Sequence, residues 1–336
     1  MKVQRLRLSN DKISWTVLDN RHQAIAPIND FLTSQQALGR SPNTIRAYAH
    51  HLRRWWEYLD GADQKDWQTI SRADIADFIN GLRARKSRQS STINAIVAAV
   101  ISFYDYQDQA AEYHTRFGSR SKRHQFVHSM ANRNRPFAQP ISKRPPETLT
   151  KEQVLTLITA CQLKRDKLLL TLLYQTGMRI GQALGLRHED IDSEDNLIRI
   201  VPRDDNANGM RAKTRHEYIV HISTHLITLY TDYLVNEYPD MDSDYVFVAL
   251  FGQSRGRPLT YHSVVSLFNR LGRKTDIVTH PHAFRHTHVT ELLQAGIEPR
   301  IIQQRVGHQS INTTMENYAH LTATDVKREF QRAQIL

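Results

Sequence analysis

The chain has 336 residues, of which 40% are hydrophobic and 24% are charged, and its formal net charge is +11. This length favours two domains, and this balance of residues excludes a chain that is disordered throughout. A single cysteine, Cys161, excludes an internal disulfide and a cysteine-based zinc site. The positive charge suits a polyanionic partner, although many soluble proteins are basic for no specific reason.

The chain shows no sign of export or membrane insertion. Its N-terminus, MKVQRLRLSNDK, lacks the apolar segment of a signal peptide. No stretch approaches the roughly 18 consecutive apolar residues that a membrane helix needs. We therefore expect a soluble, cytoplasmic protein.

Residues 1–22 predict a small hairpin. Apolar residues alternate loosely along residues 1–20, and the polar turn Ser9–Lys12 separates two such runs. The hairpin is either an accessory element or simply an addition to the domain that follows, and the sequence leaves its function open.

Residues 23–115 follow a helical pattern. Ser41 and Pro42 have the residue types of an N-cap and a first helical turn. The apolar residues after them recur every three or four positions, which gives the helix one apolar face. Similar runs occur in Asp74–Leu82 and after Ser91. These segments predict a compact bundle of four or five helices.

Residues 116–147 are interpreted as a basic linker between two domains. No Asp or Glu occurs from Tyr113 to Pro146, and the stretch ends in two prolines. Such a linker either lies along a phosphate backbone or is a solvated tether, and its composition does not decide between the two.

Residues 148–336 predict a second domain, of the α+β class. Thr150 and Gln153 have capping-box spacing at the start of a helix, and Gly177 ends the helix Lys167–Thr176. The order is helices, a small antiparallel sheet and helices again, so the whole chain is expected to be mainly α. We expect strands over Leu197–Val201, Glu217–Ile222 and Tyr245–Leu250, and later helices over Tyr261–Leu271, Ala283–Gln294, Pro299–Val306 and Ile311–Tyr318.

Three segments of this second domain hold the residue types that phosphate-ester chemistry uses. Arg179 stands just past a glycine at a helix start, and His282 and Arg285 share one helical face. A Gly-His pair at His308 precedes a capped helix that carries Tyr318. Guanidinium groups hold phosphate oxygens through paired hydrogen bonds and stabilise the charge of the transition state.

Each of these residues alone also has an ordinary structural explanation, as a surface ion pair, a helix cap or a core tyrosine. His282 and His286 have metal-ligand spacing, but no Glu follows His282 and no third ligand stands out. No GxxxxGK[ST] loop occurs either. We expect neither a metal nor a nucleotide cofactor.

Taken together, these segments resemble the signature boxes of the tyrosine recombinase (phage integrase) family, in the same order. The resemblance covers roughly residues 25 to 325, and in the last box the tyrosine follows the histidine by ten residues. The matching segments are SPNTIRAYAHHLRRWWEYL (41–59, opening a core-DNA-binding helical domain), YQTGMRIGQALGLRHEDID (174–192, first arginine box), HAFRHTHVTELLQAG (282–296, His-x-x-Arg box) and VGHQSINTTMENYAH (306–320, Gly-His box).

The resemblance implies a role for each matching residue. Tyr318 would be the nucleophile that forms a 3′-phosphotyrosyl bond with DNA. Arg179 and Arg285 would clamp the scissile phosphate. His282 would accept or relay protons, and His308 would donate a hydrogen bond to a phosphate oxygen.

Two further positions of the family pattern are less regular here. The family has a lysine on a turn between two strands, which corresponds to Lys213, the general acid for the leaving 5′-oxygen. Arg211 and Arg215 flank it, so this assignment stays open. Three positions after the first arginine the family usually has an acidic residue, where this chain has Gln182. An amide supplies some of the same hydrogen bonds, so we expect a tuned site and not an inactive one.

The resemblance also implies partners. The family works as a tetramer on two double-stranded DNA sites, with accessory DNA-bending proteins in some systems. Arg46 and Arg53 are candidate phosphate contacts in the helical domain. Residues 324–336 carry an apolar stripe that docks either on a neighbouring protomer or on its own domain.

Two other functions fit part of the same pattern. A type IB topoisomerase uses the same tyrosine chemistry, but the integrase-like boxes and the helical first domain argue against it. A catalytically silent DNA-binding protein has only Gln182 in its favour. Integration, excision, transposition and the resolution of replicon dimers are not distinguished, although the additional N-terminal segment slightly favours a mobile element.

Overall fold

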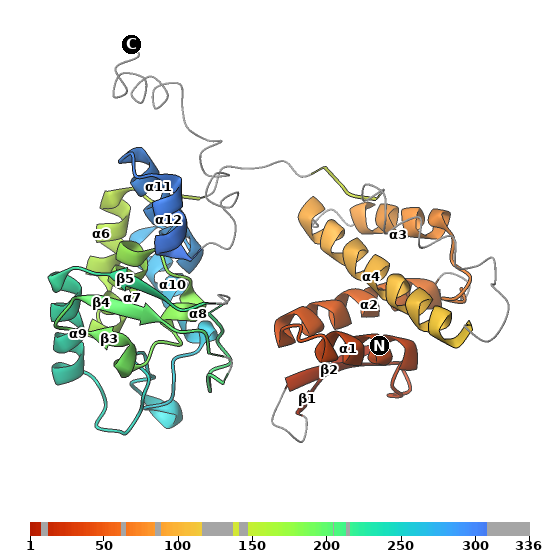
Figure 1. The fold of residues 1–336 in the computed structure, drawn as a ribbon, viewed down its shortest axis with the longest axis horizontal. Coiled ribbons are helices and arrows are strands. Elements are labelled where there is room, and N and C mark those ends of the chain that lie inside the picture. The colour runs from red at the N-terminus through yellow and green to blue at the C-terminus, as the bar shows by residue number, and fades with distance from the viewer. Residues whose placement is uncertain are drawn as a thin grey trace, which may run out of the picture. The chain divides into compact units, whose positions relative to one another are not determined.

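The computed structural model describes the chain except for residues 8–12, 62–64, 85–88, 116–136, 141–146, 204, 213–215 and 308–336, and it describes no side chains for residues 110–115. The chain divides into two compact units, Met1–Lys143 and Arg144–Leu336. Figure 1 shows a hairpin and helices in the first unit, and helices around a small sheet in the second.

The N-terminal unit is an antiparallel hairpin on a helical bundle. Strand β1 pairs with β2 over its whole length, from Lys2 opposite Leu18 to Arg7 opposite Ile13. The hairpin packs on α1 and α2. The elements are β1 (Lys2–Arg7), β2 (Ile13–Leu18), α1 (Ala26–Ala37), α2 (Pro42–Gly61), α3 (Arg72–Ala84) and α4 (Ser90–Thr115).

Helix α2 shows why this sequence forms a bundle. The Ser41 hydroxyl accepts a hydrogen bond from the Thr44 N–H at 3.2 Å, which caps the helix as its residue type predicts. Trp55 lies at the centre of the core with no exposed surface. Its indole N–H donates to the Tyr104 hydroxyl, which in turn donates to the Trp67 carbonyl. The residues of α2 that are buried recur at helical spacing: Ile45, Ala49, Leu52, Trp55 and Leu59.

Of the predicted linker, the structure describes residues 137–140 and 147, and Phe137 and Gln139 contact the N-terminal unit. The Gln139 N–H donates to the Asn94 side chain at 2.7 Å, and the Asn94 amide donates back to the Gln139 carbonyl at 3.0 Å. Phe137 packs against the core of the same unit. This part of the chain is therefore attached to α4.

The C-terminal unit surrounds a three-stranded antiparallel sheet with helices. The sheet order is β3-β4-β5, with Ile198 of β4 opposite Val220 of β5. The prediction of a mainly helical chain with a small antiparallel sheet is thus confirmed. The elements are α6 (Lys151–Ala160), α7 (Lys164–Thr176), α8 (Ile180–Ala183), η2 (His188–Asp190), β3 (Ile191–Asp192), β4 (Leu197–Ile200), β5 (Tyr218–His221), α9 (Thr224–Asn236), η3 (Gly252–Ser254), α10 (Tyr261–Thr275), α11 (Pro281–Gln294) and α12 (Pro299–Val306).

Helix α7 lies at the centre of this unit. The start of the preceding helix, α6, and the end of α7 both have the predicted capping residues. Thr150 and Gln153 form the full capping box at the start of α6. Gly177 ends α7 in the left-handed conformation, with φ of 61°. Along α7 even Arg165 and Asp166 are buried, where they pair with each other at 2.7 Å. Because most residues of α7 are buried, the helix fixes the position of the segment that follows Gly177.

The segment Tyr245–Leu250 is not a strand, so that prediction was wrong. Its residues are buried as expected, but they pair with two separate short segments instead of one neighbouring strand. Tyr245 bridges Arg187, and Val248 bridges Pro258. The predicted helix Ile311–Tyr318 lies outside the described residues.

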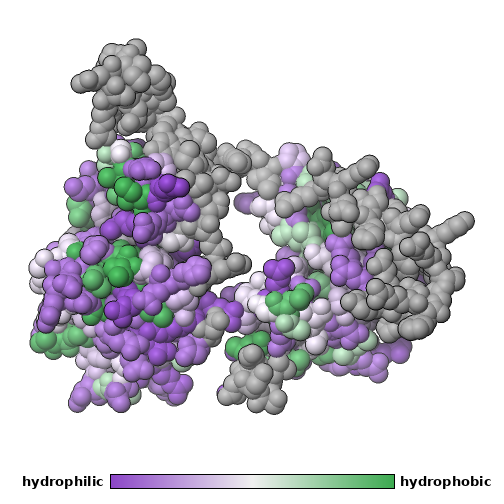
Figure 2. Space-filling model, viewed as in Figure 1, coloured by the Kyte–Doolittle hydropathy of each residue, from purple (hydrophilic) through white to green (hydrophobic). Residues whose placement is uncertain are grey.

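The surface of this unit is mainly polar. Figure 2 shows hydrophilic residues over most of its visible face, with hydrophobic residues in separate small areas. Across the described part of the chain, no helix combines the length and apolar character needed to cross a membrane.

Candidate active site

Arg179 occupies the turn between α7 and α8. Gly177 allows the chain to reverse direction here, and a Cβ atom at that position would lie 2.6 Å from the His288 ring. Arg179 follows as the N-cap residue of α8 and is half-buried. The left-handed glycine and its close packing therefore fix where this guanidinium starts.

Arg285 projects from α11 towards the same region. It is only 2% exposed, and it donates hydrogen bonds to the Gly177 carbonyl at 2.7 Å and to the Val306 carbonyl at 2.8 Å. Arg179 donates to the Gly307 carbonyl at 3.2 Å. Both guanidinium groups thus bind the backbone at the C-terminal end of α12, where the helix dipole is negative.

The two arginines lie in a strongly electropositive environment. Burial, with Arg179 as the second cause, lowers the pKa of Arg285 to about 9. Burial also lowers the pKa of Arg179. Among the residues that the structure describes, no carboxylate pairs with either group. A buried and a half-buried cation, with no anionic partner among the described residues, stabilise a bound anion.

Gln182 connects this arginine pair to the sheet. It is 3% exposed, and its side-chain oxygen accepts from the Arg179 N–H at 2.7 Å. Its amide donates to the Tyr218 hydroxyl at 2.9 Å. Gln182 is therefore a buried neutral group with both ends of its side-chain amide hydrogen-bonded.

Tyr218 is a site residue that the sequence analysis missed. Its ring packs under Gly307, where an added Cβ atom would lie 2.7 Å from the ring. Burial raises the pKa of its hydroxyl, so it stays protonated at neutral pH. Tyr218 has the ordinary residue type of a strand, and nothing in the local sequence marks its contact with Gly307.

His282 and His286 lie one turn apart on α11, with ring centroids 4.5 Å apart. His282 is an exposed residue of α11. Partial desolvation of its ring, followed by the charges of His286 and Arg285, lowers the pKa of His282 to about 4. The ring is therefore neutral at pH 7. No cluster of three possible metal-ligating side chains occurs among the described residues.

His288 and Arg305 join α11 and α12 to the rest of the unit, and the sequence analysis missed both. The Arg305 Nε donates to the His288 ring at 3.2 Å, and its terminal nitrogen donates to the Gln175 carbonyl at 3.0 Å. Figure 1 shows α11 and α12 side by side at one end of the unit. These bonds hold the end of α12, and with it Gly307, against the arginine pair.

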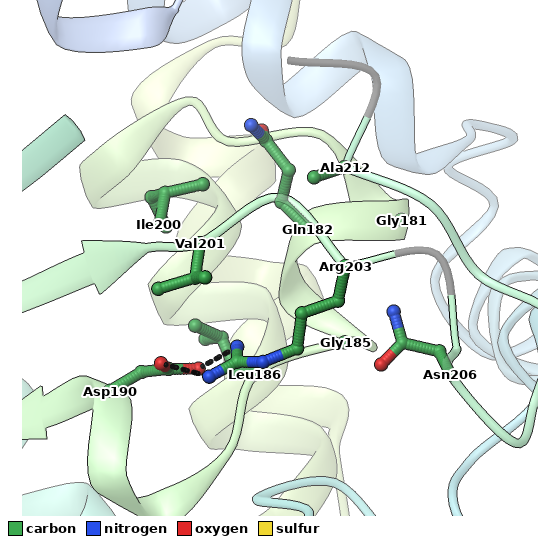
Figure 3. A pocket seen from close by; sticks show the side chains of 10 residues that line it. All are labelled: Gly181, Gln182, Gly185, Leu186, Asp190, Ile200, Val201, Arg203, Asn206 and Ala212. Atoms are coloured by element: carbon green, nitrogen blue, oxygen red, sulfur yellow. Dashed lines mark hydrogen bonds and ion pairs between the residues drawn. The ribbon is translucent and has the colours of Figure 1, made fainter. Parts of the chain in front are cut away.

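The loop between β4 and β5 packs directly on α8. Gly181 lies so close that a Cβ atom would be 2.6 Å from the Arg211 carbonyl. Asn208 donates to the carbonyls of Leu184 and Leu259, each at 2.9 Å, and its oxygen accepts from the Met210 N–H. Figure 3 shows the small pocket that this contact encloses, with Ala212 and Gln182 on its wall.

An ion pair stabilises the other side of this pocket. Arg203 donates to both carboxylate oxygens of Asp190, at 2.7 and 2.8 Å, as the dashed lines in Figure 3 mark. The Asn206 amide donates to the Met210 carbonyl at 2.9 Å. The described part of the loop is thus held at both ends, up to the residue that precedes Lys213.

The structure brings together three of the six predicted catalytic residues, Arg179, His282 and Arg285. Lys213, His308 and Tyr318 lie outside the described residues. Their neighbours in sequence are described, however: Ala212 lines the pocket beside Gln182, and Gly307 accepts a bond from Arg179.

The two candidate DNA contacts lie on α2 of the other unit. The exposed Arg46 places its guanidinium 5.2 Å from the centre of the Trp15 ring. Arg53 lies 3.6 Å from the Glu57 carboxylate. Arg46 is therefore held by an aromatic ring, and Arg53 by a partial ion pair.

Comparison with known proteins identifies this arrangement. The profile of the "Phage integrase family" matches residues 147–325, and that of the "Phage integrase, N-terminal SAM-like domain" matches residues 28–110. Transposase A from transposon Tn554 of Staphylococcus aureus is 36% identical over 99% of this chain and 98% of its own length. Tyrosine recombinase XerA of Pyrococcus furiosus is 29% identical over 92% of this chain and 94% of its own.

Solved structures agree on the fold. The Tn1549 transposon integrase in complex with transposon right end DNA matches with a TM-score of 0.68 and 19% identity, over 91% of this chain and 99% of that one. The XerH recombinase bound to palindromic difH substrate matches with a TM-score of 0.64 and 19% identity, over 90% and 82%. The profiles and the relatives together show that this chain belongs to the tyrosine recombinase (phage integrase) family and is a site-specific recombinase of that type.

Proposed function

We propose that Tyr318 attacks a DNA phosphodiester in the site formed by Arg179 and Arg285. The phenolic oxygen forms a bond to phosphorus, the bond to the 5′-oxygen breaks, and a 3′-phosphotyrosyl link remains. This link keeps the energy of the phosphodiester, so the 5′-hydroxyl of a second duplex can reverse the step and exchange the strands. No step of this scheme uses a metal ion or a nucleotide.

The observation that carries the proposal is the arginine pair. Arg285 is 2% exposed and shares its region with Arg179, with no described carboxylate beside either. A phosphate there would receive hydrogen bonds from two groups that the fold has already positioned. The charge that builds up on phosphorus oxygens in the transition state would be stabilised in a largely dry environment, where such interactions are strongest.

Three residues would handle protons and orientation around that phosphate. A free tyrosine has a pKa of about 10, so Tyr318 must lose its proton during attack. His282 is neutral at pH 7 and would accept that proton, since a bound phosphate favours the charged form of a nearby imidazole. His308 directly follows Gly307 and would donate a hydrogen bond to a phosphate oxygen.

Lys213 would protonate the leaving 5′-oxygen. The support for this role is the attachment of the preceding residues to α8. Asn208 and Asn206 fix the backbone up to Ala212, and Ala212 lines the same pocket as Gln182. Lys213 is the next residue after Ala212, and we propose that it reaches the phosphate bound by the arginine pair.

The likeness to the Tn554 transposase, which extends over 99% of this chain, favours a mobile element as the biological substrate. We propose that the protein integrates, excises or transposes such an element and does not resolve replicon dimers. It would act in the cytoplasm as a homotetramer on two specific duplex sites, with Arg46 and Arg53 contacting phosphates. The solved relatives named above are bound to their own DNA sites.

The test is a covalent-trapping assay with the full chain and a nicked duplex from the end of its element, without metal or ATP. We expect an adduct that survives denaturation with the unchanged protein and with Tyr261→Phe. Tyr261 is 45% exposed at the start of α10 and serves as the matched control. Tyr318→Phe should give no adduct.

An adduct that persists in Tyr318→Phe would overturn the assignment of the nucleophile. Specific binding to the same duplex without any adduct would support the catalytically silent DNA-binding alternative.

A further inference from the structure

The N-terminal hairpin carries two exposed arginines on the same face as Trp15, whose ring contacts Arg46. Cross-strand partners in an antiparallel pair project to the same face, and Arg5 is opposite Trp15 while Arg7 is opposite Ile13. Val3 and Trp15 on this face pack against the core of the unit. Arg5 and Arg7 continue the same face beyond the packed part, and both are exposed.

Helix α2 carries a basic stripe next to this face. Arg46, His50, Arg53 and Arg54 recur at spacings of three and four residues, so they lie on one side of the helix. Trp15 contacts the start of the stripe, since its ring centroid is 6.4 Å from that of His50 and 5.2 Å from the Arg46 guanidinium.

The charged residues of the two hairpin strands and of the stripe are mainly basic. The strands Lys2–Arg7 and Ile13–Leu18 hold no acidic residue. On the stripe itself, Glu57 lies 3.6 Å from Arg53 at the far end. Burial and three arginines of the stripe lower the pKa of His50, which is the electrostatic signature of a cation cluster.

We propose that the hairpin and α2 form one surface for the phosphate backbone of duplex DNA, in which Arg5, Arg7 and Arg46 contact phosphates. This inference rests on the proposed function as a DNA recombinase and extends it to an element outside the matched family profiles, which begin at residue 28. Trp15 is a positioning residue, because its ring holds the Arg46 guanidinium in place before DNA binds.

The arrangement has two physical consequences. Arg5 and Arg7 are two residues apart on a strand, so they present two charges about 7 Å apart on one face. Phosphate contacts of this kind bind without regard to base sequence and release counterions, so affinity falls as salt rises. The hairpin would therefore add affinity and salt dependence and would read no bases.

The test compares Arg5→Gln with Lys2→Gln in the full chain. Both changes remove one charge from the same strand, but Lys2 lies opposite Leu18, on the other face of the hairpin. Affinity for a short fluorescent duplex of mixed sequence is measured over a range of salt concentrations. Thermal unfolding of each variant shows that the hairpin is intact.

We expect Arg5→Gln to reduce the slope of log affinity against log salt by about one, as the loss of one phosphate contact does. Lys2→Gln should leave the slope close to that of the unchanged protein. If the two variants have equal slopes, whether both are changed or both are unchanged, the proposed role of this hairpin face is wrong. The proposed function as a recombinase is not affected by that result. Failure of the unchanged protein to bind any duplex would instead overturn the proposed function as well.

Discussion

Arg46 and Arg285, for which we propose different roles towards DNA phosphates, lie in opposite environments. Arg46 is exposed on α2 and contacts the Trp15 ring, whereas Arg285 is 2% exposed and is bonded to two backbone carbonyls. A single contact of an exposed arginine contributes little free energy, and salt screens its charge. A buried arginine acts where the dielectric is low, so its effect on a reacting phosphate is large. The N-terminal unit thus suits affinity, and the C-terminal unit suits chemistry.

The largest effect should come from Arg285→Lys. A lysine keeps the charge but cannot bond the Gly177 and Val306 carbonyls in the same geometry. We expect the rate of adduct formation at saturating DNA to fall about 10²- to 10³-fold. Arg199→Lys, at a 50% exposed position on β4, is the matched control and should react at the normal rate. A normal rate for Arg285→Lys would separate this arginine from the chemistry.

Asn208→Ala should give the next largest effect on the rate. It removes the bonds to Leu184 and Leu259 that fix the loop before Lys213. We expect about a tenfold slower cleavage, since a 1 Å misplacement of a catalytic group costs up to about 100-fold. A substrate with sulfur in place of the 5′-oxygen needs no acid, so it should restore the rate of this variant and of Lys213→Ala. It should not rescue Arg285→Lys. Without such rescue, the loop does not act through a general acid.

Tyr218→Phe should reduce stability more than it reduces DNA affinity. The change leaves the buried Gln182 amide without its partner, which costs about 1–3 kcal/mol in the free energy of unfolding. Urea unfolding measures the loss, and Gln182→Leu in the same background should recover part of it. An unchanged free energy of unfolding would show that this bond does not support the site.

His288 should make the stability of the C-terminal unit depend on pH. Burial, followed by the charges of Arg305 and Arg285, lowers its pKa from 6.5 to about 4 in the folded protein. The unfolded chain binds more protons between these values, so the free energy of unfolding should fall as the pH drops from 6.5 towards 4. His288→Gln should make this fall shallower in urea titrations at several pH values. If the free energy of unfolding of His288→Gln decreases just as steeply, other groups cause this pH dependence.

The smallest effect should come from Arg46→Gln. We expect several-fold weaker binding at low salt and a salt slope that is shallower by about one. Its effect on the apparent Kd should exceed its effect on the cleavage rate at saturating DNA, which is the reverse of Arg285→Lys. A rate defect as large as that of Arg285→Lys would abolish the distinction between the two units.

Much of this architecture follows from local sequence patterns. Capping at Ser41 and Thr150, the helix end at Gly177 and the pairing of β4 with β5 depend on neighbouring residues, and the structure agrees with each. The segment Tyr245–Leu250 failed because its apolar pattern reports burial and not the partner that completes a strand.

The hydrogen bonds that hold the site residues in place could not be predicted, for a related reason. Gln182 meets Tyr218 across 36 positions, and Arg305 meets His288 across 17, through contacts that no local periodicity encodes. The boxes indicate which residues are expected to face the phosphate. The fold alone determines which residues hold them there.

The most direct test of the central claim is to identify the amino acid that carries the DNA. The trapped adduct is digested with trypsin and nuclease, and the modified peptide is sequenced by mass spectrometry. We predict a nucleotide linked through its 3′-phosphate to Tyr318, within the peptide that runs from residue 306 to residue 327. A nucleotide on any other residue, or one linked through a 5′-phosphate, would contradict the account.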